Sequence, residues 1–103
     1  DPEEFFYNSY GVIADEDITA ETVIIKVESD QARYIRALPL HHSQRETETT
    51  ADYSFFEYYI KPTYDFRQEL LSHGADVEVL SPAWFRSEMK TVVSEMKQCY
   101  MRK

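Results

Sequence analysis

Two stretches decide the fold: residues 22–27, which read TVIIKV, and residues 53–61, which read YSFFEYYIK. In the first stretch Val23, Ile25 and Val27 alternate with other residues and share one face, which is typical of a half-buried strand. The second stretch is rich in aromatic residues and stops before a proline, which cannot donate a hydrogen bond to a neighbouring strand. We therefore predict that both stretches are central strands of one β-sheet.

The sequence around these strands predicts a βαββαβ order followed by a helix. Polar, Thr-rich residues 44–50 are typical of an edge strand, and residues 75–80 alternate as a fourth strand. The spacing of apolar residues predicts helices over residues 30–38, 64–73 and 82–101. Two βα units joined by a hairpin predict an α+β fold, a ferredoxin-like βαββαβ sandwich with right-handed crossovers and an extra C-terminal helix.

Cap and turn residues mark the ends of these helices. We expect Glu28–Asp30 and Thr63 to cap the first two helices, and Ser81 to cap the third, with Pro82 in its first turn. Gly74 is expected to end the second helix in a left-handed conformation. The inward-facing positions define the expected core: Val23, Ile25, Val27, Ile35, Leu38, Phe56, Tyr58, Ile60, Leu70, Val77 and Val79.

The composition of the 103-residue chain excludes several classes of protein. Hydrophobic residues make up 43% and aromatic residues 15%, which is more than a disordered chain carries. The single cysteine excludes a disulfide framework and a cysteine-based zinc site. The sequence has no apolar run long enough for a membrane-spanning helix and no signal or lipidation motif. We therefore expect a cytoplasmic protein without a membrane partner.

Charge is distributed unevenly along the chain. The net charge of −8 disfavours non-specific binding of a phosphate backbone over the whole surface. Residues 1–21 carry seven acidic residues and no basic one, whereas residues 81–103 carry five basic and two acidic residues. A local basic patch is therefore compatible with the sequence, but a basic surface is not.

The histidines and the cysteine do not form a recognisable catalytic or metal site. His41 and His42 adjoin Ser43, but catalytic triads are assembled from separate segments, and the sequence lacks a nucleophile elbow. Consecutive histidines on a strand point to opposite faces, and His73 stands alone at a predicted helix end. No neighbouring pattern lowers the pKa of Cys99. We predict that the chain is not an enzyme and holds no metal or cofactor.

The stretch from Val23 to Tyr100 resembles the C-terminal extension (WCX) domain of bacterial transcriptional regulators that contain a WYL domain. Residues 1–12, DPEEFFYNSYGV, resemble the segment that joins the WYL domain to the extension. Pro39 precedes His42-Ser43-Gln44, where the family often reads Pro-x-His-x-Ser-Gln. The other matching motifs, in chain order, are Ala32-Arg33-Tyr34-Ile35, Leu70-Leu71-x-x-Gly74, Val77-Glu78-Val79-Leu80-x-Pro82 and Trp84-Phe85-Arg86.

The resemblance implies a domain organisation and a function. Residues 1–21 would be a linker or helical segment after a WYL domain that this chain lacks, and residues 22–103 the extension domain. The domain would be a non-catalytic regulatory, effector-sensing and dimerisation module, and an absent helix-turn-helix domain would contact DNA. The Trp-Tyr-Leu tripeptide and the basic pocket of the WYL domain are not in this sequence. Because the first residue is Asp1 rather than Met, we expect a piece of a longer protein.

A cluster of hydrogen-bond donors follows the first predicted helix. An anionic effector needs a local excess of donors in an acidic domain, and arginine offers a planar fork to phosphate. Protonated histidines strengthen anion binding, so affinity is expected to rise as the pH falls through about 6.5. The resemblance adds that the WYL domain and its extension jointly form effector sites, some for single-stranded DNA or nucleotides. The predicted effector-binding residues are Arg33, Arg36, His41, His42, Gln44 and Arg45.

Two other interpretations stay open at this point. The cluster is also compatible with an ordinary solvated face on which one or two arginines pair with acids, and isolated surface charges of this kind are common. On the aromatic strand, Phe55 and Tyr59 share the face away from the predicted helices. That face suits either the stacking of single-stranded nucleic acid bases or coverage by a neighbouring domain or second subunit. A small-molecule-sensing domain of the same topology is a further alternative.

The last predicted helix adds a prediction about association. Its apolar stripe and Trp84 exceed what a small sandwich needs for its own core. The aromatic face of the sheet adds further exposed surface. We therefore predict a homodimer in the parent protein, closed by two-fold symmetry.

Overall fold

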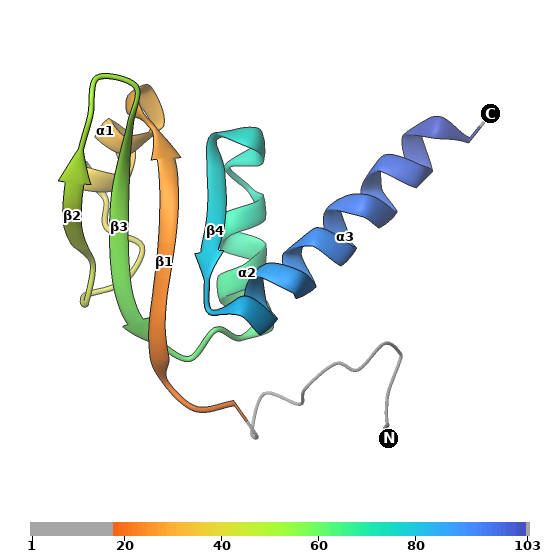
Figure 1. The fold of residues 1–103 in the computed structure, drawn as a ribbon, viewed down its shortest axis with the longest axis horizontal. Coiled ribbons are helices and arrows are strands. Elements are labelled where there is room, and N and C mark those ends of the chain that lie inside the picture. Colours follow the sequence, from red (N-terminus) through yellow and green to blue (C-terminus); the bar gives the residue numbers. More distant parts are fainter. Residues whose placement is uncertain (1–17, 103) are drawn as a thin grey trace.

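The computed structural model describes residues 18–102, and Figure 1 shows their arrangement. Four strands form one antiparallel sheet in the order β2-β3-β1-β4. The strands are β1 (Glu21–Glu28), β2 (Arg45–Thr49), β3 (Tyr53–Ile60) and β4 (Val77–Ser81). The prediction that the two quoted stretches are central strands is therefore confirmed, and the α+β class is confirmed with it.

Three α-helices lie within the described part of the chain, namely α1 (Ser29–Ala37), α2 (Tyr64–Leu71) and α3 (Ala83–Met101), and a 3-10 turn, η2 (Gly74–Asp76), follows α2. Figure 1 shows α1 and α2 on one side of the sheet, while α3 starts beside β4 and runs away from it. None of these helices has both the length and the apolar character needed to cross a membrane.

The core lies between the sheet and its helices. Register pairs Val23 with Tyr58 and Ile25 with Phe56, so the inward side chains of the central strands meet directly. The prediction for Leu38 is wrong, because α1 ends at Ala37 and leaves this side chain 76% exposed beyond the last turn. Ile60 and Val77 are only partly buried. The buried cluster is Val23, Ile25, Val27, Ala32, Ile35, Phe56, Tyr58, Phe66, Leu70, Val79, Phe85 and Met89.

The helix ends follow the predicted chemistry only in part. The Glu28 carboxylate accepts hydrogen bonds from the N–H groups of Asp30 and Gln31, which lower the pKa of Glu28 and cap α1. Thr63 occupies the N-cap of α2, as predicted, although its side chain makes no capping hydrogen bond. Pro82 rather than Ser81 occupies the N-cap of α3, because β4 continues through Ser81.

Two further predictions concern the turn after α2 and the N-terminal segment. Gly74 has φ of 64°, which confirms the expected left-handed turn after α2. The predicted linker over residues 1–21 lies outside the described residues as far as residue 17.

Candidate functional site

The loop between α1 and β2, residues 38–44, is termed the histidine loop, and Ser43 holds it against β3. The Ser43 hydroxyl accepts a hydrogen bond from the Tyr59 N–H at 2.9 Å and donates one to the Tyr59 carbonyl at 3.2 Å. His41 Nδ1 lies 2.7 Å from the same hydroxyl oxygen. The Ser43 side chain thus extends the hydrogen bonding along β3 to Tyr59, two residues beyond the last strand pair between β2 and β3, and it also contacts His41.

The Gln44 side chain holds the same loop through hydrogen bonds to α1, to Leu40 and to β3. Its Oε1 accepts hydrogen bonds from the Leu40 N–H at 3.0 Å and the Tyr58 hydroxyl at 2.6 Å, and its Nε2 donates to the Ile35 carbonyl at 2.9 Å. Burial raises the pKa of Tyr58, so its phenol stays protonated and remains a donor. Gln44 therefore ties α1, the histidine loop and β3 together, and three of its hydrogen-bonding positions are used internally.

Two of the three arginines predicted to bind an effector are paired with glutamates. Arg36 donates through Nε and Nη2 to both carboxylate oxygens of Glu46, at 2.8 Å and 2.7 Å, and holds the pKa of Glu46 at about 2. Arg45 forms an ion pair with Glu57 on the neighbouring strand. Arg33 is exposed and forms no ion pair with any of residues 18–102. Among the arginines of the cluster, Arg33 is the one whose charge is not offset by a described partner.

The two histidines of the loop lie side by side but differ in burial. Their rings lie 4.1 Å apart. His42 is exposed. Burial, and to a smaller degree the charge of His42, lower the pKa of His41. Protonation of His41 is therefore less favourable than protonation of a histidine in water, which weakens its predicted contribution to anion binding.

A shallow hollow of about 240 Å³ joins the loop to the open face of the sheet, which is the face away from α1 and α2. The hollow brings predicted effector residue Arg45 beside predicted stacking residue Tyr59. Ser43 and Glu57 also line it, and the sequence interpretation did not assign either to the site. The sequence could have indicated Ser43, because this residue belongs to the His42-Ser43-Gln44 motif that resembles the WCX family. The pairing of Glu57 with Arg45 depends on strand register and could not be read from spacing alone.

The open face is aromatic but not basic. Tyr53 packs edge-on against Phe55 at 5.3 Å, and the Lys26 ammonium lies 4.4 Å from the centre of the Tyr53 ring. Tyr59 is 63% exposed. Acidic side chains share this face: the strand pairing places Glu78 opposite Lys26, and Glu57 opposite Arg45. Carboxylates at these positions offset the two cations that a phosphate backbone would need.

The family model of the WCX domain matches residues 19–97. The chain belongs to the WCX domain family. The match includes the whole sheet and the histidine loop and ends within α3, so it agrees with the resemblance carried by the sequence motifs. A search of curated proteins finds no match to this WCX domain.

Proposed function

We propose that this WCX domain is the non-catalytic, effector-sensing part of a cytoplasmic bacterial transcriptional regulator that also contains a WYL domain and a helix-turn-helix domain. The observation that carries this proposal is the family match over residues 19–97. We further infer a ferredoxin-like arrangement, because each helix connection joins strands that lie two places apart, as in a split βαβ unit.

The effector surface in this proposal is the histidine loop with the exposed side of α1. Ser43 and Gln44 hold the loop rigidly, while Arg33 and His42 face solvent and are available to a ligand. A phosphate-bearing effector, such as single-stranded DNA or a nucleotide, suits these donors. The preceding WYL domain would supply the remaining cationic groups, so the isolated domain should bind weakly.

The open face is better suited to a protein partner than to nucleic acid. Tyr53, Phe55 and Tyr59 provide contact area, but Glu57 and Glu78 offset the neighbouring cations and leave no positive charge in excess for a phosphate backbone. We place the homodimer contact of the parent protein on this face. Sedimentation of the full-length regulator should show a dimer that Tyr59→Glu weakens, and a monomer at high concentration for the unsubstituted regulator would contradict this assignment.

The effector proposal is tested by comparing two changes on the same helix in the full-length regulator. Arg33→Ala should weaken binding of a short single-stranded DNA several-fold and reduce the slope of log affinity against log salt by about 1, because one phosphate contact is lost. The control, Arg36→Ala with Glu46→Ala, removes an ion pair without changing the net charge and should leave both quantities near those of the unsubstituted protein. Unchanged affinity and salt slope on Arg33→Ala would remove this surface from the effector site.

A further inference from the structure

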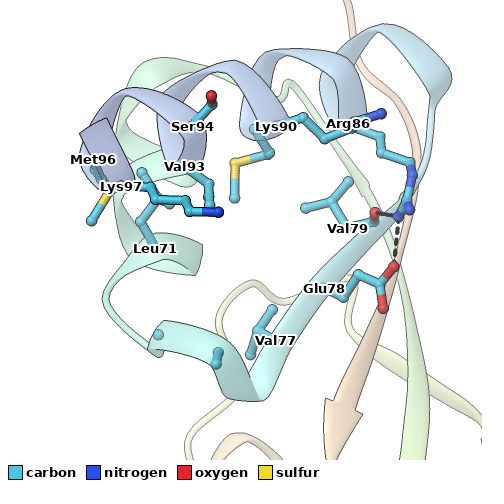
Figure 2. Close-up of a pocket in the computed structure, with 13 residues that line it drawn as sticks. Leu71, Val77, Glu78, Val79, Arg86, Lys90, Val93, Ser94, Met96 and Lys97 are labelled. Atoms are coloured by element: carbon cyan, nitrogen blue, oxygen red, sulfur yellow. Dashed lines mark hydrogen bonds and ion pairs between the residues drawn. The ribbon is translucent and has the colours of Figure 1, made fainter. Parts of the chain in front are cut away.

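A groove separates α3 from β4, and Figure 2 shows the side chains that line it. Its volume is about 640 Å³, larger than that of the hollow beside the histidine loop. The floor is apolar and comes from three elements, with Leu71 at the end of α2, Val77 and Val79 on β4, and Met89, Val93 and Met96 on α3. The domain therefore presents an apolar surface that its own described core does not fill.

The groove exists because only the first turns of α3 belong to the core. Phe85 is fully buried, and its ring stacks on that of Phe66 at 6.2 Å. Further along the same stripe, Val93 is 52% exposed and Met96 is 48% exposed. Figure 1 shows the helix leaving the sheet in this direction. Apolar side chains left in water at regular helical spacing mark a docking surface.

The rim of the groove is cationic. Arg86 closes one end, where its Nη1 donates to Glu78 at 2.8 Å and to the Val79 carbonyl at 2.7 Å, as Figure 2 shows. Lys90 and Lys97 stand along the α3 side and form no ion pair with any of residues 18–102. An apolar floor with unpaired lysines above it fits an occupant that is both apolar and acidic.

Charge decides between a second copy of this helix and another segment of the chain. A second α3 carries three basic and two acidic residues, so it lacks the excess of acidic groups that would complement Lys90 and Lys97. Residues 1–17 read DPEEFFYNSYGVIADED and carry six acidic and no basic residues around a set of aromatic and aliphatic ones. This segment has the composition that the groove requires.

The point at which the segment joins the domain is also suitable. Ile18 is buried, and the Glu21 carboxylate accepts a hydrogen bond from the Trp84 indole N–H at 2.8 Å, so the chain enters beside the first turn of α3. The stretch of α3 from Arg86 to Lys97 rises only about 16 Å. An extended segment of the length of residues 1–17 spans up to about 56 Å, so it can follow the groove within one molecule.

We propose that residues 5–13 dock in the α3 groove of the same chain, with their apolar side chains on its floor and the flanking acids near Lys90 and Lys97. Docking would give the segment that leads into this domain a defined position against α3. This inference stands on the groove and on the charges of the chain, and it holds or fails independently of the effector proposed above.

The test uses the complete 103-residue chain labelled with ¹⁵N and a nitroxide on Cys99, which is exposed on α3 and is the only cysteine. The nitroxide should broaden the amide signals of residues 5–13. Lys90→Glu with Lys97→Glu should remove most of this broadening, whereas Lys61→Glu, at the end of β3 and outside the groove, should preserve it. Adding Glu3→Lys and Glu4→Lys to the first pair should restore it, since the charges are then exchanged between segment and rim.

Three outcomes would overturn the proposal. The first is the absence of broadening in the unsubstituted chain, and the second is broadening that the lysine reversals leave unchanged. The third is broadening that is reproduced when nitroxide-labelled ¹⁴N chains are mixed with unlabelled ¹⁵N chains, because that result would assign the groove to a second copy. The dispersed amide signals of β1 report in each case that the variant is folded.

Discussion

The histidine loop and the α3 groove both lie outside the core, but they differ in whether their side chains have partners within the domain. In the loop, polar groups of Ser43 and Gln44 find partners within the domain, so the loop has a defined shape without any other component. In the groove, Val93 and Met96 stay half-exposed and Lys90 and Lys97 stay unpaired among the described residues. The comparison indicates that the loop already has the conformation in which it would meet a ligand, whereas the groove is completed only when another segment binds in it.

The largest effect should separate the two halves of α3. Phe85→Ala removes a fully buried ring that stacks on Phe66 and should lower the free energy of unfolding by about 3–5 kcal/mol. Tyr100→Ala, on the same helix but 87% exposed, should change it by no more than about 0.5 kcal/mol. Urea unfolding of both variants measures the difference. Equal losses would show that the distal half of α3 is packed as tightly as the first turns.

An intermediate effect should come from the histidine loop. Gln44→Ala leaves the Tyr58 hydroxyl and the Leu40 N–H without their acceptor and should cost about 1–3 kcal/mol of unfolding free energy. Tyr58→Phe removes one of these hydrogen bonds together with its donor and should cost less. If Gln44→Ala unfolds at the same urea concentration as the unsubstituted chain, the loop is not held by this amide.

The smallest effect concerns the ion pair on the edge of the sheet. Arg36 lowers the pKa of Glu46 from an ordinary value of 4.5 to about 2. The stabilisation from this shift is therefore complete above pH 4.5 and is lost as the pH falls from 4.5 towards 2. Glu46→Gln should flatten the dependence of the unfolding free energy on pH in that window. Identical pH profiles for the two proteins would contradict the assigned pKa.

The sequence predicted the regular elements better than the surfaces between them. Alternation in residues 22–27 and 53–61 identified both central strands because their inward positions are apolar. The prediction that Leu38 belongs to the core was wrong because the apolar stripe continues in the sequence past Ala37, where the helix itself ends. The number of hydrogen-bond donors in this part of the sequence could not show that Arg36 is paired and Arg33 is not. The partner Glu46 reaches Arg36 only because β2 folds beside α1.

The α3 groove could not be predicted from the spacing of apolar residues. The stripe from Phe85 to Tyr100 is continuous in sequence, and nothing in its periodicity shows that the helix leaves the sheet after Met89. That direction depends on how β4 meets the first turn of α3. The prediction that this stripe exceeds the needs of the core is confirmed for its distal part, which is exposed, but is wrong for Trp84, which packs against the core.

Amide hydrogen exchange on the 103-residue chain tests this contrast most directly. The amides of Leu40 and Tyr59, which donate to Gln44 and Ser43, should exchange as slowly as those of the sheet and be unaffected by Lys90→Glu with Lys97→Glu. The amides from Val93 to Tyr100 should exchange several-fold faster in that variant than in the unsubstituted chain, because their occupant is released. Equal exchange of distal α3 in the two proteins, together with faster exchange in the loop, would contradict the account.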